Sequence, residues 1–386
     1  MIVIDASPLQ TAHKYRGIGV YTGGLLDAMT RLRQPEALGL LAEPAHAEDL
    51  PLLADLLARP HVTKVTLPRP EWRRSRLQWV VGLASVYPTL LRARPRIYHA
   101  TEGSGLVRVP GVTTVATLYD LIPLHDEAAH FPLSRVDNRI GYARYLHLLQ
   151  RVDHLIAISE ATKRDAVARL RIPPERITVT PLAVDERHFY PRPSVEIDRV
   201  LARYRLRRPY FLHIGSSDPN KNTANILRAF TTFCHHGHSE RVLCIVGKWP
   251  AQALAQLERS HPDLLSSGRL RMLGYVPDDD LPALYGGADL FVYPSLLEGF
   301  GLPILEAMRC ACPVLTSTVS SLPEVAGDAA LLVDPHDPEA MAEAMARLAS
   351  DAQLRADLVR RGLQRAQGFS WTRTAELTLR VYQSLL

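Results

Sequence analysis

Apolar and polar positions follow two alternating patterns along this chain. Short apolar runs bounded by turn residues have the length and composition of buried β-strands, and longer stretches between them repeat their apolar residues with helical spacing. The strands predicted in this way lie at 1–7, 96–100, 113–120, 154–159, 177–184, 210–216, 241–247, 270–276, 289–295, 313–317 and 330–335. The clearest helices are expected at 19–32, 222–234 and 337–350. Strand–helix alternation predicts an α/β protein with parallel sheets and helices on both faces.

The alternation is interrupted at 185–210, where proline and charged residues are frequent and no strand pattern occurs. We place a domain boundary there, near residue 190, because 386 residues exceed one ordinary core and suit two domains. The predicted domains are 1–190 and 191–369, and an amphipathic helix pattern follows at 370–386. Two doubly wound domains would bind ligands at the carboxyl ends of their strands.

Composition narrows the class of protein only moderately. Hydrophobic residues make up 47% of the chain and charged residues 22%, as in soluble globular proteins. The formal net charge of +5 fits anionic small molecules, an anionic membrane surface or nucleic acid, and selects none of them. Cys310 and Cys312 lie in an apolar run typical of small buried thiols. Because neither a signal peptide nor a membrane span is apparent, we expect a cytoplasmic protein.

The stretch "YPSLLEGFGLPILEAM" at 293–308 combines two glutamates with a glycine-rich turn. Gly299 and Gly301 fall where a strand gives way to a helix, so the backbone and the helix N-terminus can approach an anion closely. Glu298 and Glu306 bracket this turn, and carboxylates accept hydrogen bonds from sugar and ribose hydroxyls. The combination indicates a nucleotide sugar. On spacing alone, a helix-capping Glu306 and a solvated Glu298 are an equal alternative.

Three further places carry candidate chemistry. Lys221 opens a helix after a strand and a polar loop, where a lysine could bind a diphosphate, although lysines are also common at solvated loop ends. Gly17 and Gly19 precede another helix and permit close backbone approach to a charged group. Asp120 follows Tyr119 at a strand's carboxyl end, where it could accept a sugar hydroxyl, steady a developing cation or simply form a turn.

These residues carry a family resemblance. The segment at 294–337, "PSLLEGFGLPILEAMRCACPVLTSTVSSLPEVAGDAALLVDPHD", closely resembles the donor-binding region of retaining glycosyltransferases of family 4. Shorter matches, including "RGIGVYT", "YDLIPL", "GSSDPNKN" and "FSWTRTAE", run along the whole chain. The resemblance implies the GT-B fold, in which two Rossmann-like doubly wound domains face each other across a cleft. It also implies that the helix at 370–386 crosses back onto the first domain.

The resemblance assigns roles residue by residue. Glu306 matches the glutamate that holds the nucleotide ribose, Glu298 the one placed against the transferred sugar, and Lys221 the diphosphate-binding lysine. The other implied donor contacts are the amides of Gly299, Phe300, Gly301 and Leu302, the phosphate-proximal Gly17 and Gly19, and Tyr275 and Val276 beside the base. Lys221, Glu298 and Asp120 are the expected catalytic residues.

Two positions depart from the family pattern. Ser216 stands where many members have an arginine, so one positive charge on the diphosphate is missing unless Lys248 or an arginine replaces it. Tyr119 stands where many members have a histidine that contacts the donor sugar. We interpret the tyrosine as the mark of a subgroup of active enzymes.

The resemblance implies retention at the anomeric carbon without a bound metal or cofactor. "DDD" at 278–280 precedes a helix and is expected to cap it rather than to bind metal. The leading hypothesis is transfer of a hexose, mannose from GDP-mannose, to a glycan or lipid-linked acceptor in envelope polysaccharide assembly of the O-antigen type. A catalytically idle nucleotide-sugar-binding subunit and a nucleotide-sugar epimerase of GT-B architecture are the alternatives.

The segment at 69–96 combines two tryptophans, an apolar stretch and flanking arginines. It fits peripheral contact with the inner face of the cytoplasmic membrane, and equally a core helix with a solvated basic face. No nucleic-acid partner is expected, because the basic residues are scattered and no aromatic-basic motif occurs.

Overall fold

The computed structural model describes residues 1–11, 17–32, 36–43, 50–68, 82–125, 136–237 and 240–386. They form two compact units: unit 1 comprises Met1–Ala183 and Ser370–Leu386, and unit 2 comprises Val184–Phe369. The predicted boundary near residue 190 lies a few residues beyond this division. The C-terminal segment belongs to unit 1.

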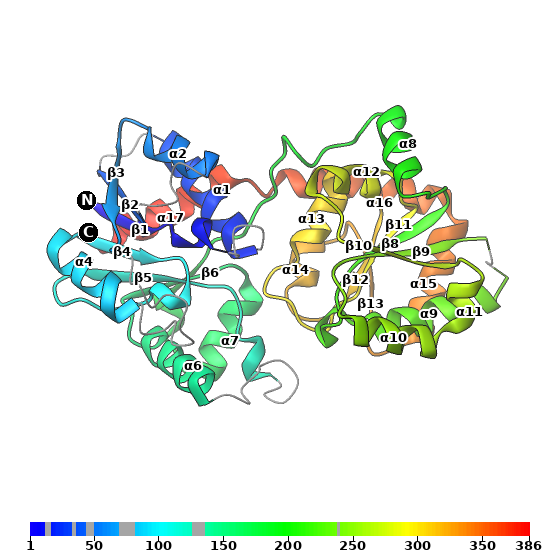
Figure 1. Ribbon diagram of the computed structural model, residues 1–386, viewed down its shortest axis with the longest axis horizontal. Coiled ribbons are helices and arrows are strands. Elements are labelled where there is room, and N and C mark those ends of the chain that lie inside the picture. Colours follow the sequence, from blue (N-terminus) through cyan, green and yellow to red (C-terminus); the bar gives the residue numbers. More distant parts are fainter. Residues whose placement is uncertain (12–16, 33–35, 44–49, 69–81, 126–135, 238–239) are drawn as a thin grey trace. The chain divides into compact units, whose positions relative to one another are not determined.

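Within the described residues, unit 1 contains a 7-stranded parallel sheet in the order β3-β2-β1-β4-β5-β6-β7 (Figure 1). Its strands are β1 (Ile2–Asp5), β2 (Leu38–Ala42), β3 (Val62–Thr66), β4 (Ile97–Ala100), β5 (Thr113–Leu118), β6 (His154–Ala157) and β7 (Ile177–Val179). The sequence predicted all of them except β2 and β3. The α-helices of unit 1 are α1 (Gly17–Arg31), α2 (Pro51–Leu57), α4 (Tyr87–Ala93), α6 (Val136–Leu149), α7 (Glu160–Leu170) and α17 (Trp371–Leu385).

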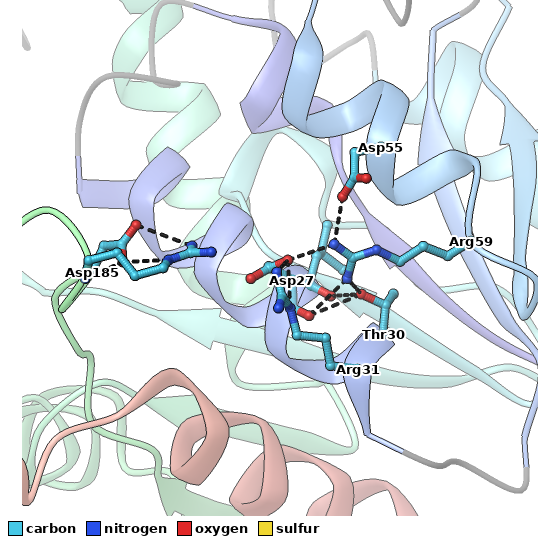
Figure 2. Close-up of polar contacts among 8 residues, drawn as sticks. Asp27, Thr30, Arg31, Asp55, Arg59 and Asp185 are labelled. Carbon is cyan, nitrogen blue, oxygen red and sulfur yellow. Dashed lines mark hydrogen bonds and ion pairs between the residues drawn. The ribbon is translucent and has the colours of Figure 1, made fainter.

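Helix α1 is held between α2 and α17. Figure 2 shows Arg59, just after α2, bridging Asp27 of α1 at 2.7 Å and Asp55 at 2.6 Å. On α17, Trp371 packs so closely on Gly24 that a Cβ there would lie 2.2 Å from the indole ring. Figure 1 accordingly draws α17 (red) beside α1 (blue) in unit 1. The start of α1, with its two candidate glycines, is therefore fixed by packing further along the helix.

Unit 2 contains a 6-stranded parallel sheet in its described residues, in the order β10-β9-β8-β11-β12-β13. Its strands are β8 (Tyr210–Ile214), β9 (Val242–Val246), β10 (Leu270–Gly274), β11 (Leu290–Tyr293), β12 (Val314–Ser317) and β13 (Leu331–Val333), as predicted. The strand order reverses between β8 and β11, and open parallel sheets bind ligands at such a reversal.

Helices cover both faces of this second sheet, as the alternation predicts (Figure 1). They are α8 (Ser194–Arg203), α9 (Thr223–His235), α10 (Ala251–Ser260), α11 (Pro262–Ser266), α12 (Leu281–Gly287), α13 (Leu302–Arg309), α14 (Leu322–Ala326), α15 (Pro338–Ser350) and α16 (Ala352–Gln367). Helices α9 and α15 pack side by side over a core that includes Phe211, Phe230 and Met345. Cys310 and Cys312 are fully buried thiols, as predicted.

The expectation that the acidic run at 278–280 caps a helix is wrong. Asp280 precedes α12, but its side chain makes no capping hydrogen bond. Its carboxylate instead accepts hydrogen bonds from Arg203 at 3.0 Å and from Tyr204 at 2.7 Å. A buried carboxylate is stabilised more by a guanidinium and a hydroxyl than by one backbone amide, so Asp280 ties α8 to α12.

Candidate active site

Lys221, Tyr293 and Glu298 form one hydrogen-bonded cluster at the reversal between β8 and β11. Lys221 ends a short 3₁₀ turn (Pro219–Lys221) that follows β8, and Tyr293 is the last residue of β11. The ammonium of Lys221 donates to the hydroxyl of Tyr293 at 2.8 Å and to Oε1 of Glu298 at 2.7 Å. The Tyr293 hydroxyl donates to the same carboxylate oxygen at 2.7 Å. Two predicted catalytic residues are thus brought together, with a tyrosine between them.

The cluster keeps a positive charge on Lys221. Burial alone would lower the pKa of this lysine, but the neighbouring Tyr293 and Glu298 outweigh burial and hold its pKa above the ordinary value. Lys221 is therefore protonated at every physiological pH. A fixed ammonium at the end of a strand can neutralise an anion that binds or departs there.

His213 of β8 supports this cluster from inside the unit. Its Nδ1 lies 2.9 Å from the carbonyl oxygen of Val292 and its Nε2 lies 3.2 Å from the hydroxyl of Thr223. Burial lowers the pKa of His213 to about 4, so the ring is neutral. Nδ1 therefore donates to Val292, and Nε2 accepts from Thr223, the first residue of α9. Gly215 lies against this ring, where a Cβ would be 2.2 Å from Nε2.

The glycine-rich turn is shaped by Gly301 and by two serines. Gly301 has φ of +104°, and a Cβ there would lie 2.6 Å from Leu322, so the position requires glycine. The Ser320 hydroxyl donates to the carbonyl of Glu298 at 2.7 Å, and Ser321 donates to that carbonyl and to the carbonyl of Phe300. These contacts fix the backbone that includes Gly299 and leads into α13 at Leu302.

Phe300 contributes its backbone, not its ring, to the turn. The ring is 4% exposed and packs edge-on against Phe369 with centroids 6.0 Å apart.

Glu306 lies on α13, which follows the turn, and has its own partner. The hydroxyl of Tyr285 donates to its carboxylate at 2.8 Å. Burial raises the pKa of Glu306 to about 7; the Tyr285 hydrogen bond opposes this rise and Asp278 adds to it. The alternative interpretation from spacing is wrong on both points. Glu306 does not cap the helix, and the side chain of Glu298 is only 14% exposed.

The remaining predicted contacts of unit 2 lie around this core. Ser216 accepts a hydrogen bond from the amide of Asp218 at 3.2 Å. Val276 is buried, whereas Tyr275 is 63% exposed, with the ammonium of Lys248 4.8 Å from its ring centroid. Lys248 thus lies over the ring of Tyr275, the residue predicted to lie beside the base.

The predicted residues of unit 1 lie at the start of α1 and after β5. The structure corrects one expectation: Gly17 and Gly19 do not precede the helix but form its first turn, and Gly19 is buried. Tyr119 donates its hydroxyl to the carbonyl of Thr101 at 2.8 Å. Asp120 accepts the amide of Ile122 at 3.1 Å, so its turn-forming role is observed. Any substrate role of these residues stays a prediction.

Sequence reasoning missed Tyr293, His213 and the two serines. Tyr293 sits at the carboxyl end of a predicted strand, which was a usable signal. The alternation within a short, fully buried strand cannot tell which hydroxyl finds a charged partner.

No group of three or more histidine, cysteine, aspartate or glutamate residues suited to a metal ion occurs among the described residues. No helix in those residues is long and apolar enough to cross a membrane. Of the segment at 69–96, residues 69–81 lie outside the described residues. The rest contains a π-helical turn (Gly82–Val86) and α4. Strand β4 begins just after this segment, at Ile97.

The two parallel α/β units and the site at a strand-order reversal define a protein of the GT-B fold. The model of the family described as glycosyl transferases group 1 matches residues 197–365, and that of glycosyltransferase family 4 matches residues 15–188. The chain belongs to these glycosyltransferases, which confirms the family and the fold class expected from the sequence.

Its relatives include an O-antigen chain mannosyltransferase B of Escherichia coli, 39% identical over 235 residues that cover 60% of this chain and 60% of that protein. The serotype-specific mannosyltransferase WbdA of the same species is 32% identical over 71% of this chain. The match spans only 34% of WbdA's length.

Solved structures of similar fold support the GT-B architecture. They include HepE of Anabaena in complex with UDP and glucose, with a TM-score of 0.67, 20% identity and coverage of 99% of both chains. WaaG, a glycosyltransferase involved in lipopolysaccharide biosynthesis, has a TM-score of 0.70 at 14% identity, again covering 99% of both chains. At these identities the likeness concerns the fold alone.

Proposed function

We propose that this protein is a retaining, metal-independent glycosyltransferase that transfers mannose from GDP-mannose to a glycan or lipid-linked acceptor. The observation that carries the proposal is the Lys221–Tyr293–Glu298 cluster at the strand-order reversal of unit 2. The choice of mannose, and of an O-antigen-type product, is supported by the names of two relatives, which are mannosyltransferases.

In this reaction Lys221 binds the diphosphate of the donor. The acceptor hydroxyl attacks the anomeric carbon from the face on which the bond to phosphate breaks, and its proton passes to an oxygen of the departing diphosphate. No protein base is required in that sequence. As negative charge grows on the leaving group, the ammonium of Lys221, the amides at the Gly299–Leu302 turn and the N-terminus of α13 stabilise it.

The two glutamates would hold opposite ends of the donor. Glu306 accepts the ribose hydroxyls and Glu298 accepts hydroxyls of the transferred sugar. Because Glu298 also binds Lys221 and Tyr293, the residue that orients the sugar is mechanically tied to the residue that binds the diphosphate. The base would lie beside Tyr275 and Val276.

We propose that the enzyme transfers the hexose at the cytoplasmic face of a membrane, where a lipid-linked acceptor would lie. Contact with that surface through the segment at 69–96 is part of this proposal and not a requirement of the chemistry.

A thermal-shift panel of GDP-mannose, UDP-glucose and dTDP-glucose tests the donor assignment. GDP-mannose should give the largest stabilisation. Glu306→Ala should weaken GDP binding, whereas Glu298→Ala should leave GDP binding nearly unchanged and lower turnover. If no nucleotide sugar stabilises the protein at millimolar concentration, or if both variants bind GDP like the wild type, the assignment fails.

The same protein and nucleotide sugars, assayed for turnover, distinguish this proposal from an idle binding subunit and from an epimerase. An idle binding subunit would bind GDP-mannose without releasing GDP in the presence of any acceptor. An epimerase would convert the nucleotide sugar with no acceptor present.

A further inference from the structure

A cavity lies in unit 2 beside the loop that carries Lys221. Its volume is about 470 Å³, within the range of small-molecule sites. One wall is the loop at 216–219 with the first turn of α9, and the other is Trp249 with one face of α10. Lys221, Tyr293, Glu298 and Glu306 are not among the lining residues, so the cavity does not include the cluster described above. Ser216, a predicted donor contact, also lines the cavity.

The lining of this cavity contains no cationic side chain among the described residues. Asp218 is the one carboxylate among them, and neither lysine nor arginine occurs there. One oxygen of Asp218 accepts the amide of Asn220 at 3.0 Å. Burial and, to a smaller extent, the nearby positive charge of Arg228 lower the pKa of His261. This imidazole is therefore uncharged at neutral pH. A phosphate group would find no cation among these residues, and an uncharged ligand fits better.

Several polar side chains of the lining have no partner in the part of the chain that the structure describes. They are the hydroxyl of Ser217 and the amide of Gln256, both on exposed residues, and the half-buried imidazole of His261. Trp249, Leu257 and Leu296 also line the cavity. An aromatic ring, a planar amide, an imidazole and a hydroxyl together with two leucines suit a ligand with many hydroxyls and apolar C–H faces.

We infer that this cavity is a saccharide-binding site for a neutral hexose unit of a glycan, distinct from the donor site. The inference rests on the proposed function in one respect: a glycan chain is taken as the natural source of the hexose. It adds a second place where the growing glycan binds the enzyme, next to the loop that holds Lys221.

The position of the cavity predicts coupling to the donor. Ser217 and Asp218 line the cavity, and Lys221 ends the same loop three residues further on. The amide of Leu296, whose side chain lines the cavity, also donates to the carbonyl of Asn220 at 2.8 Å. A saccharide that orders this loop should therefore strengthen GDP binding, and GDP should strengthen saccharide binding by the same factor.

The test uses α-mannotriose as the probe and isothermal titration calorimetry as the readout, with GDP titrated separately. Ala253→Phe fills the cavity from α10, and Gln256→Ala removes one polar group without filling it. Ala251→Phe is the matched control, because Ala251 is exposed on the same helix and does not line the cavity. Thermal denaturation reports whether each variant is folded.

The wild type should bind mannotriose with a Kd on the order of 1 mM, and Ala253→Phe should weaken binding about tenfold or more. Gln256→Ala should weaken it about threefold, and Ala251→Phe should leave it unchanged. All variants should bind GDP alone like the wild type. If Ala253→Phe does not fold, Gln256→Ala carries the test.

Three results would overturn the inference: no mannotriose binding to the wild type, equal binding by the folded cavity variants, or GDP displacing mannotriose. The last result would make the cavity part of the nucleotide site. If GDP-mannose fails to bind while mannotriose follows the predicted order of variants, the proposed donor is wrong and the saccharide site stands.

Discussion

The carboxyl edges of the two sheets differ in how their candidate residues are used. In unit 2, Lys221 and Glu298 are bound to each other and to Tyr293, so charged side chains from separate loops meet in one place. In unit 1, Tyr119 and Asp120 bind nearby backbone groups. The same kind of sequence motif at a strand end thus gives a charged cluster in one unit and local backbone geometry in the other.

The difference follows from what each unit must supply. A group that stabilises developing charge must be fixed before the reaction, and a lysine is fixed by an ion pair with a buried partner. A glycine-rich helix start acts through its backbone amides, so side chains from separate loops need not meet there. We therefore expect substitutions in unit 2 to reduce turnover much more than substitutions in unit 1.

The largest effect is expected for Lys221→Ala. Loss of the ammonium removes the positive charge that faces the departing diphosphate, and turnover should fall about 10³-fold. The measurement is release of GDP from GDP-mannose with an α-mannoside acceptor. Lys64→Ala, which removes an exposed lysine from β3, is the control and should have no effect. A loss of turnover no larger than that of the control would mean that Lys221 does not stabilise the departing diphosphate, and the contrast between the two units would fail.

Tyr293→Phe should lower kcat about tenfold and leave the KM for the donor nearly unchanged. The ion pair survives in this variant, but the hydroxyl that accepts a hydrogen bond from Lys221 and donates one to Glu298 is lost. The control is Tyr210→Phe in β8, a strand of the same sheet. This variant removes a buried hydroxyl that donates to the carbonyl of Leu284 at 2.6 Å.

Tyr210→Phe should cost about 1 kcal/mol of unfolding free energy and no turnover. Equal losses of kcat in both variants would mean that Tyr293 acts only through general stability.

Asp120 tests the comparison from the side of unit 1. Asp120→Asn keeps an oxygen that can accept the amide of Ile122 and removes the charge, so turnover should fall only about threefold. Asp120→Ala loses the turn as well and should be worse. If Asp120→Asn were as damaging as Lys221→Ala, the carboxylate would act on the substrate directly and the contrast between the units would collapse.

Most strands were predictable because they form short runs dominated by apolar residues. The strands of the sheet in unit 2 consist mainly of apolar residues, although β10 carries Arg271 and is only partly buried. In unit 1, β3 instead places two valines among exposed threonines and a lysine, as an edge strand does. β2, with the sequence LGLLA, has leucines and alanine that fit a helix as well. Only its pairing with β1 and β3 decides in favour of a strand.

Helix α8 was missed for a different reason. Its surroundings are rich in proline and charge, but Ile197, Val200 and Leu201 recur with helical spacing and are buried. The side chains of Ile197 and Leu201 lie where a Cβ on Gly287 of α12 would be, at 3.0 and 3.3 Å. The partner that makes this face buried lies far along the chain, so the pattern alone was interpreted as a domain boundary.

The candidate site was predictable to the extent that its residues carry charge in a glycine-rich context. Lys221, Glu298 and Glu306 met that condition. Tyr293 and His213 did not, because a buried hydroxyl or a neutral imidazole becomes functional only through the partner that the fold brings to it.

The smallest effect concerns the charge of Glu306. Its pKa rises from 4.5 to about 7, mainly through burial. Between those pH values the unfolded chain has lost this proton and the folded protein keeps it. The stability contributed by this group is therefore fully present below pH 4.5 and is lost as the pH rises through 7.

Glu306→Gln removes this titration but keeps an acceptor for the Tyr285 hydroxyl. The variant should melt at about the same temperature as the wild type at pH 5 and a few degrees higher at pH 8.5. Glu343→Gln on α15, which changes an exposed glutamate, should follow the wild type at both pH values. A constant offset across the pH range would contradict the raised pKa. A growing difference would mean that the residue proposed to bind ribose costs stability in its ionised form, which a residue kept only for folding would not do.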